Sequence, residues 1–179
     1  MSAIAELKSD NILIKEYLID QRCRSMRDNL IFTGIAETTD SYEDTEKVLK
    51  NFIKDELKHD PEKIDFKRIH RIGARRSRSD KPRSIIAKFN VTSQRDLIKR
   101  SGKELKGKSY RIFEQFPEEV SEYRRNVLYP LQFEARKNNK RAHIIVDRLY
   151  IDNVQQKVKP PPPYRVPGSQ KQNRLVNDR

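Results

Sequence analysis

The chain contains very little cysteine and histidine, and this excludes two common ways of stabilising a small fold. Among its 179 residues there are one cysteine and three histidines, scattered at Cys23, His59, His70 and His143. A single cysteine cannot form an internal disulfide, and it is typical of a protein from a reducing compartment. The scattered positions lack the ligand spacing of a metal site. We therefore expect neither a metal nor a cofactor.

Long apolar runs are also missing. No segment approaches the roughly 20 apolar residues that cross a bilayer. The start of the chain, MSAIAELKSDN, lacks the apolar core and the cleavage site of a secretory signal. We expect a protein of the cytosol or nucleus without a membrane partner.

Acidic residues are outnumbered by basic ones. The chain has 39 Lys and Arg against 26 Asp and Glu, a formal net charge of +13. An excess of this size repels itself in a compact monomer, and it points to a polyanionic partner such as nucleic acid. A solvated surface, on which charge only aids solubility, is the alternative interpretation.

The first segment has no glycine or proline up to Asn29. Its apolar residues alternate three and four positions apart, which is the spacing of a coiled-coil seam. The sequence predicts a helix over residues 1–28 that self-associates, with one amphipathic helix packed on its own domain as the alternative. The expected oligomerisation residues are Ile4, Leu7, Asn11, Ile14 and Leu18.

Residues 29–116 alternate between strand-like and helix-like periods. DNLIFTGI is a short branched and aromatic run ended by Gly34, which predicts a strand. Ser41 and Asp44 resemble a capping box that opens a helix. The remaining expected elements are a helix at 42–58, strands at 64–72, 84–89 and 110–116, and a short helix between Ser93 and Gly102. The order β-α-β-β-α-β predicts a ferredoxin-like unit within an α+β protein.

Residues 117–156 predict a second, small α/β unit. A helical stripe follows Pro117 and is interrupted by Pro130, so we expect two helices or one kinked helix. HIIVDRLYI at 143–151 predicts two short strands or one longer strand. The tail, 157–179, is proline-rich and then polar, which predicts disorder with a short polyproline II start.

GKELKGKS at 102–109 fits the phosphate-loop pattern G-x-x-x-x-G-K-[ST]. A phosphate loop follows a strand and opens a helix. Here the expected helix comes first and the expected strand, YRIFEQF, comes after it. We expect a basic turn, no catalytic residues, no enzymatic activity and no small-molecule substrate.

The order of elements matches an RNA recognition motif, whose central strands display aromatics that stack on bases. The third-strand signature is poorly met by PRSIIAKF, because Ser84 and Ile86 occupy the stacking positions. In the first strand we expect Phe32 to be buried and Ile31 exposed, and the opposite frame would offer one stacking aromatic. Contacts to the phosphate backbone should therefore dominate.

Five motifs carry a closer resemblance: RDNLIFTGI, RIHRIG, PRSIIAKF, LKGKSYRI and RRNVLYPLQFEARKNN. Their ordered series resembles the first-open-reading-frame protein of LINE-type retrotransposons over roughly residues 1–152. The resemblance implies a coiled coil, an atypical RNA recognition motif and a C-terminal nucleic-acid-binding domain. It also implies a homotrimer that packages the element's RNA into a cytoplasmic ribonucleoprotein, with the nucleus as a second compartment, and acts as a nucleic-acid chaperone.

The resemblance places RNA contacts in the loop before the third strand, at Arg75, Arg76 and Arg78, and further on at Arg124 or Arg125 and at Arg141. Ile31 stands where the family has a basic residue. We expect noncatalytic binding of RNA and single-stranded DNA, with a coiled-coil protein-interaction module as the alternative. The expected contact set is Arg68, Arg71, Arg75, Arg76, Arg78, Arg83, Lys88, Arg111, Arg124, Arg125, Arg141 and Arg148.

Overall fold

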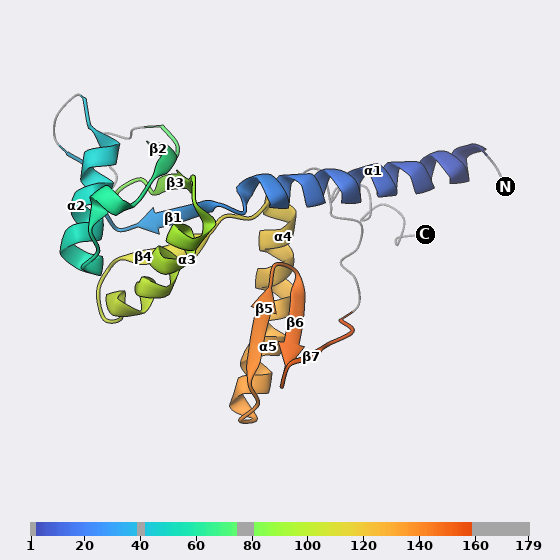
Figure 1. The fold of residues 1–179 in the computed structure, drawn as a ribbon. Coiled ribbons are helices and arrows are strands. Elements are labelled where there is room, and N and C mark those ends of the chain that lie inside the picture. The colour runs from blue at the N-terminus through green and yellow to red at the C-terminus, as the bar shows by residue number, and fades with distance from the viewer. Residues whose placement is uncertain (1–2, 39–41, 75–80, 159–179) are drawn as a thin grey trace. The chain divides into compact units, whose positions relative to one another are not determined.

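The computed structural model describes residues 3–38, 42–74 and 81–158. It is a mixed α+β protein with a long N-terminal helix and two antiparallel sheets (Figure 1). The α+β class expected from the sequence is confirmed. The chain divides into two compact units, one of Met26–Gln115 and one that combines Met1–Ser25 with Phe116–Arg179. The expected disordered tail, 157–179, lies outside the described residues from position 159 onward.

The unit Met26–Gln115 contains a four-stranded sheet whose neighbours are all antiparallel. The strands lie in the order β2-β3-β1-β4. Along the chain the elements are β1 (Asn29–Thr33), α2 (Thr45–Leu57), η1 (Pro61–Lys63), β2 (Phe66–Arg71), β3 (Ile85–Phe89), α3 (Thr92–Ser101), η2 (Gly102–Leu105) and β4 (Arg111–Glu114). Every helix and strand predicted for this stretch is present. The strands and α2 have tighter bounds than predicted, and α3 begins one residue before the expected Ser93.

Helix α2 begins later than the sequence predicts. Asp44 is the N-cap, and its carboxylate accepts a hydrogen bond from the backbone N–H of Lys47 at 3.0 Å. A single aspartate therefore supplies the cap, and the Ser41 of the expected capping box lies outside the described residues. At the other end Lys58 adopts the left-handed conformation, with φ of 59°, and stops the helix.

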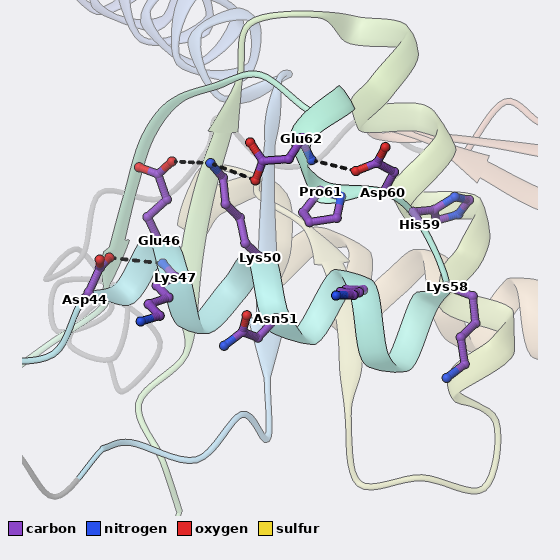
Figure 2. Close-up of a pocket in the computed structure, with 11 residues that line it drawn as sticks. Asp44, Glu46, Lys47, Lys50, Asn51, Lys58, His59, Asp60, Pro61 and Glu62 are labelled. Atoms are coloured by element: carbon purple, nitrogen blue, oxygen red, sulfur yellow. Dashed lines mark hydrogen bonds and ion pairs between the residues drawn. The ribbon is translucent and has the colours of Figure 1, made fainter.

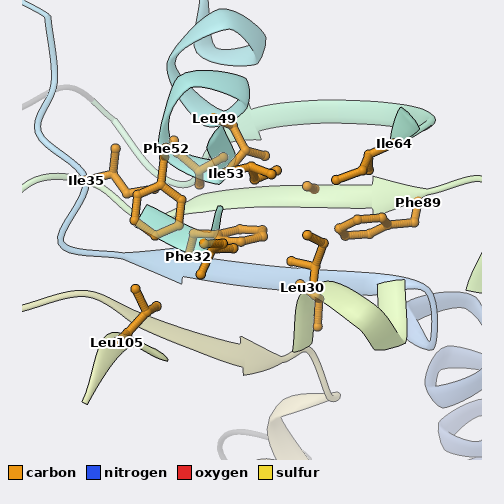
Figure 3. Close-up of a cluster of buried hydrophobic side chains, with 13 residues drawn as sticks. Leu30, Phe32, Ile35, Leu49, Phe52, Ile53, Ile64, Phe89 and Leu105 are labelled. Carbon is orange, nitrogen blue, oxygen red and sulfur yellow. The ribbon is translucent and has the colours of Figure 1, made fainter. Parts of the chain in front are cut away.

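The core of this unit lies between the sheet and its two helices. One face of α2 contributes Leu49, Phe52 and Ile53, and β1 contributes Leu30 and Phe32 from the sheet (Figure 3). The expected burial of Phe32 is confirmed, since the residue is 1% exposed. Successive strand residues point to opposite faces, and α2 and α3 pack on the face that carries Leu30, Phe32 and Phe89. Among the described residues of this unit, no helix packs on the other face, which we call the open face.

Gly34 ends β1 at a position that no other residue fits. Its φ is +86°, and a Cβ added there would lie 2.7 Å from the carbonyl oxygen of Ser109. We expect Gly34→Ala to lower the free energy of unfolding by at least about 1–2 kcal/mol, the cost of left-handed backbone for an L-residue. Urea denaturation measures this, with Gly73→Ala as control. Gly73 shares the positive φ of +86° but has no atom within 4 Å of the added Cβ. An equal loss in both variants would contradict the steric part of this explanation.

Helix α1 (Ala3–Met26) presents the predicted coiled-coil stripe to solvent. Ile4, Leu7, Ile14 and Leu18 are 66%, 68%, 58% and 52% exposed, and Asn11 is exposed as well. Within the described helix Ile19 is the buried residue. Near the C-terminal end of α1, Arg22 forms an ion pair with Glu119 at 2.8 Å. None of the described residues covers the stripe, and self-association stays a prediction.

The helical part after Pro117 runs without interruption through Pro130. It consists of α4 (Glu118–Tyr123), the π-helical turn η3 (Arg124–Leu128) and α5 (Tyr129–Lys137). The N–H of Tyr129 bonds to the carbonyl of Arg124, five residues back. This wider turn comes directly before Pro130, which has no N–H to offer. A change of helical winding thus occurs where the sequence predicts a break or kink.

A three-stranded sheet follows, with β5 (Ala142–Ile145), β6 (Arg148–Ile151) and β7 (Val154–Gln155). The first two form an antiparallel hairpin, which agrees with the two-strand alternative for 143–151. β7 was not predicted, because two residues are too short for a recognisable period. Leu149 packs with Tyr123 and Leu128 of the helices in a small core.

Candidate nucleic-acid interface

The uncovered face of the four-stranded sheet is built by strand periodicity. Ile31 pairs with Ile86 on one side and with Phe113 on the other, and Ile86 pairs in turn with His70. These four residues form one row across all four strands. A second row contains Arg68, Lys88 and Asn29, and a third contains Thr33 and Arg111.

The charge on this face has one sign. Arg68 and Arg111 are exposed, and Lys88 is half-buried. None of the described strand residues on this face is acidic. Partial burial, and then the nearby Arg68, lowers the pKa of His70 below its ordinary value. The exposed Arg68 and Arg111 give this face a positive potential that attracts phosphates.

On the helix-covered side, by contrast, cations are paired with carboxylates. Glu114 of β4 accepts from Arg95 and from Lys99 of α3, each at 2.8 Å. Burial acts to raise the pKa of Glu114, but these two partners lower it overall. The Arg and Lys side chains here hold α3 to the sheet edge.

Arg71 is not available to a ligand, which corrects its place in the expected contact set. Its side chain is 3% exposed and forms an ion pair with Glu43 at 2.7 Å. The remaining guanidinium hydrogens go to the backbone carbonyls of Ile35, Ala36 and Arg83, at 2.7 to 2.8 Å. The physical reason is the alternation of side chains along β2, which places Arg71 on the core side of the sheet and Arg68 on the open side.

Glu43 completes this buried network. Burial acts to raise the pKa of Glu43, yet hydrogen bonds from Arg71 and from the Thr38 N–H lower it overall. A carboxylate that stays charged keeps Arg71 in place, so the network ties the segment after β1 to β2.

Arg83 is also engaged within the fold. Its backbone N–H and its guanidinium both donate to Glu37, at 2.8 Å, and Nη1 donates to the carbonyl of Gly73 at 3.1 Å. Arg83 therefore joins the two ends of the loop between β2 and β3. The expected contacts Arg75, Arg76 and Arg78 belong to this loop and lie outside the described residues.

The Glu37–Arg83 pair predicts a measurable acid titration. Hydrogen bonds from Arg83 lower the pKa of Glu37 from its ordinary value of 4.5 to about 2. Because the folded-state pKa is depressed, this carboxylate contributes stability above about pH 4.5 that is lost as the pH falls through about 2. Carbon-13 NMR of the Glu37 carboxyl should show the low midpoint, and Arg83→Met should return it toward its ordinary value. A midpoint that stays near 2 in Arg83→Met would refute this cause.

The two arginines of the RR pair differ in the structure. Arg124 is buried, with its guanidinium 4.4 Å from the Phe116 ring centroid and 5.5 Å from that of Tyr129. Its Nη1 donates to the carbonyl of Val146. Arg125 is exposed. Of the two expected contacts, Arg124 is a packing residue of the helical part, and Arg125 is the one that a ligand can reach.

The last two expected contacts lie on the small C-terminal sheet. Arg141 and Arg148 are both exposed, and the backbone N–H of Arg141 donates to Asp152 at 3.0 Å. His143 of β5 is paired with Tyr150 of β6, and the two rings stack with their centroids 5.2 Å apart and an angle of 6° between their planes. Of the contacts expected in this unit, Arg125, Arg141 and Arg148 are thus the exposed ones.

Sequence reasoning missed one residue on the open sheet face, Phe113. Its side chain is 51% exposed although it lies in the middle of β4. The signal was present in the period of the strand, because Ile112 packs against the core and its neighbour must point the other way. Ile31, expected to be exposed, is half-buried between Ile86 and Phe113.

The phosphate-loop lookalike joins a helix to a strand, as the sequence predicts. The segment follows α3, forms the short helix η2 and leads into β4. Leu105, inside the pattern, is 1% exposed and belongs to the core. Lys108, at the position of the phosphate-binding lysine, pairs with Glu56 at 2.7 Å. The geometry is that of an anchored turn.

A hollow of about 840 Å³ lies along α2 and the segment after it (Figure 2). Basic and acidic side chains both line it, and some of them form ion pairs. The Nζ of Lys50 lies 3.1 Å from a carboxylate oxygen of Glu46 and 4.0 Å from one of Glu62. Asp44 and Asp60 cap the helices that begin there. These residues are paired or used in capping, and the hollow offers no concentration of one charge.

Within the described part of the chain, no group of three or more His, Cys, Asp and Glu side chains is placed to hold a metal ion. Burial, with Asp147 and Asp20 nearby, raises the pKa of the Cys23 thiol, which makes it a poor nucleophile. No helix among the described residues is long and apolar enough to cross a membrane.

The search of family models finds no match to this chain, and no curated protein matches it.

Proposed function

We propose that this protein is a noncatalytic binding protein for RNA and single-stranded DNA. The observation that carries the proposal is the open sheet face, where Arg68 and Arg111 are exposed and none of the described strand residues is acidic. Phosphate contacts from such cations supply most of the affinity of nonspecific nucleic-acid binding. Single strands are favoured over duplexes because a sheet is too broad to read the deep groove of A-form RNA.

The topology supports the finer fold assignment. The order β-α-β-β-α-β, with strands arranged β2-β3-β1-β4, is that of ferredoxin-like units. RNA recognition motifs use such a four-stranded sheet and bind RNA on its open face. We assign Met26–Gln115 to this class.

The biological context rests on the sequence resemblance to LINE-type first-open-reading-frame proteins. On this basis the protein packages retrotransposon RNA into a cytoplasmic ribonucleoprotein, acts as a nucleic-acid chaperone and assembles as a homotrimer. The exposed stripe of α1 supports self-association, because four large apolar residues on one helix need a partner.

A binding titration tests the central claim. Fluorescence anisotropy with labelled single strands of mixed sequence should show binding that weakens steeply between about 50 and 200 mM salt. Unrelated sequences should bind with similar affinity, because phosphate contacts carry no sequence information. The absence of binding at the lowest salt would overturn the proposal.

The competing function is a protein-interaction module, which the exposed stripe of α1 also favours. We expect light scattering to find a multimer that Ile14→Asp converts to a monomer, since a charge in a coiled-coil seam is desolvated without a partner. Ser9→Asp, which adds the same single charge at an exposed position away from the stripe, is the matched control and should remain multimeric. A wild-type monomer at tens of micromolar would contradict the assembly. A stable multimer that does not bind oligonucleotides at any salt concentration would favour the interaction module.

A further inference from the structure

Phe113 is an exposed aromatic ring in the middle of a basic sheet face. It lies in β4 between Ile112, which packs against the core, and Glu114, which binds α3. Its side chain therefore points to the open face and is 51% exposed. The core of this unit already contains Phe32, Phe52 and Phe89 on the other face, so packing does not require an aromatic at this place.

The neighbours of Phe113 form an apolar row with cations on its flanks. Ile31 lies directly beside it, and Ile86 follows in the next strand. Arg111 is two residues away on the same face of β4, and Lys88 belongs to the adjacent row. An apolar ring bordered by positive charge complements a ligand with flat apolar groups on a negatively charged backbone.

We propose that Phe113 is a base-stacking platform on which one unpaired nucleobase of a bound single strand lies. Arg111, two residues away on the same face, then contacts a phosphate beside that nucleotide. The inference rests on the proposed function and adds to it a contact with a base. The base must be unpaired, because its face is covered by its neighbours in a duplex.

With this platform, both base stacking and phosphate contacts contribute to the binding free energy. The expected lack of sequence preference does not change. The sequence alone predicts phosphate contacts without a clear stacking residue. Stacking on an aromatic side chain strengthens binding by about 5- to 150-fold per base. Every base has a π-face, so one platform tolerates all four bases. The site should therefore distinguish nucleotides with a base from those without one.

The test compares two probes with the same phosphates. A labelled oligothymidylate and an abasic strand of equal length are titrated at a salt concentration that weakens phosphate contacts. Wild-type protein should bind the thymidylate about 5- to 150-fold more tightly than the abasic strand. Phe113→Ala should lose this difference and keep its affinity for the abasic strand. Phe133→Ala is the matched control, because Phe133 is 72% exposed on α5, and this variant should behave as wild type.

A second variant keeps the test independent of folding defects. The chain has no tryptophan, so Phe113→Trp introduces a single tryptophan at the proposed platform, and its emission is excited at wavelengths that the seven tyrosines do not absorb. Its emission should be quenched by the thymidylate and far less by the abasic strand. Equal quenching by both strands, or equal affinity of wild-type protein for both, would overturn the stacking role while leaving the proposed function intact. Failure of both strands to bind at low salt would overturn the proposed function itself.

Discussion

Arg68→Ala combined with Arg111→Ala is expected to weaken binding of single-stranded oligonucleotides about 25-fold at about 0.1 M salt. Each phosphate neutralised on a single strand contributes about 0.7 to the slope of log K against log salt. Two lost contacts therefore reduce the slope by about 1.4 and the affinity at this salt by the same number of log units. Anisotropy titrations over a range of salt concentrations measure both quantities.

The matched control removes the same charge from the other side of the unit. Lys47 and Lys54 are exposed on α2, which covers the opposite face of the sheet. Lys47→Ala with Lys54→Ala lowers the net charge by the same amount, so it should alter binding much less. If the control weakened binding as strongly as the sheet variant, the affinity would come from overall charge, and the open face would not be the interface.

Arg71→Ala is expected to destabilise the unit Met26–Gln115 by about 3–5 kcal/mol, the cost of leaving a buried charge without its partner. The Glu43 side chain is only 10% exposed, so its carboxylate would remain nearly buried without the cation that now pairs with it. The carbonyls of Ile35, Ala36 and Arg83 would lose their donor at the same time. Domains are typically stable by about 5–15 kcal/mol, so this one change removes a large share. Urea denaturation followed by circular dichroism measures it.

Arg68 provides the control for this experiment within the same strand. Its side chain is exposed on the open face, so Arg68→Ala should change the free energy of unfolding by no more than about 0.5 kcal/mol. The two arginines should then have opposite phenotypes, with Arg68 affecting binding and Arg71 affecting stability. Similar stability of the two variants would show that the buried network contributes little.

The order of secondary structure in this protein was predictable because it depends on local periods. The alternation of strand and helix patterns from Asn29 onward predicted α2, α3 and all four strands of the four-stranded sheet unit, but not the short helices η1 and η2. The burial of Phe32 followed from period two in β1. The sequence also predicted that the phosphate-loop pattern follows a helix and precedes a strand, because both of these elements are recognised from local periods. The charge balance needed no structure at all.

The roles of individual arginines were decided only by the tertiary structure. Arg68 and Arg71 belong to the same basic strand, and period two places them on opposite faces. Only the tertiary structure shows that Glu43, which lies far away in sequence, pairs with Arg71 on the core side. Arg124 and Arg125 differ for the same reason, because the carbonyl of Val146 that binds Arg124 comes from the hairpin after α5. Phe113 looked like one more apolar residue of a strand until the pairing of β4 with β1 placed it on the uncovered face. Periodicity assigns a residue to a face, but burial and ion pairing depend on what the rest of the chain brings to that face.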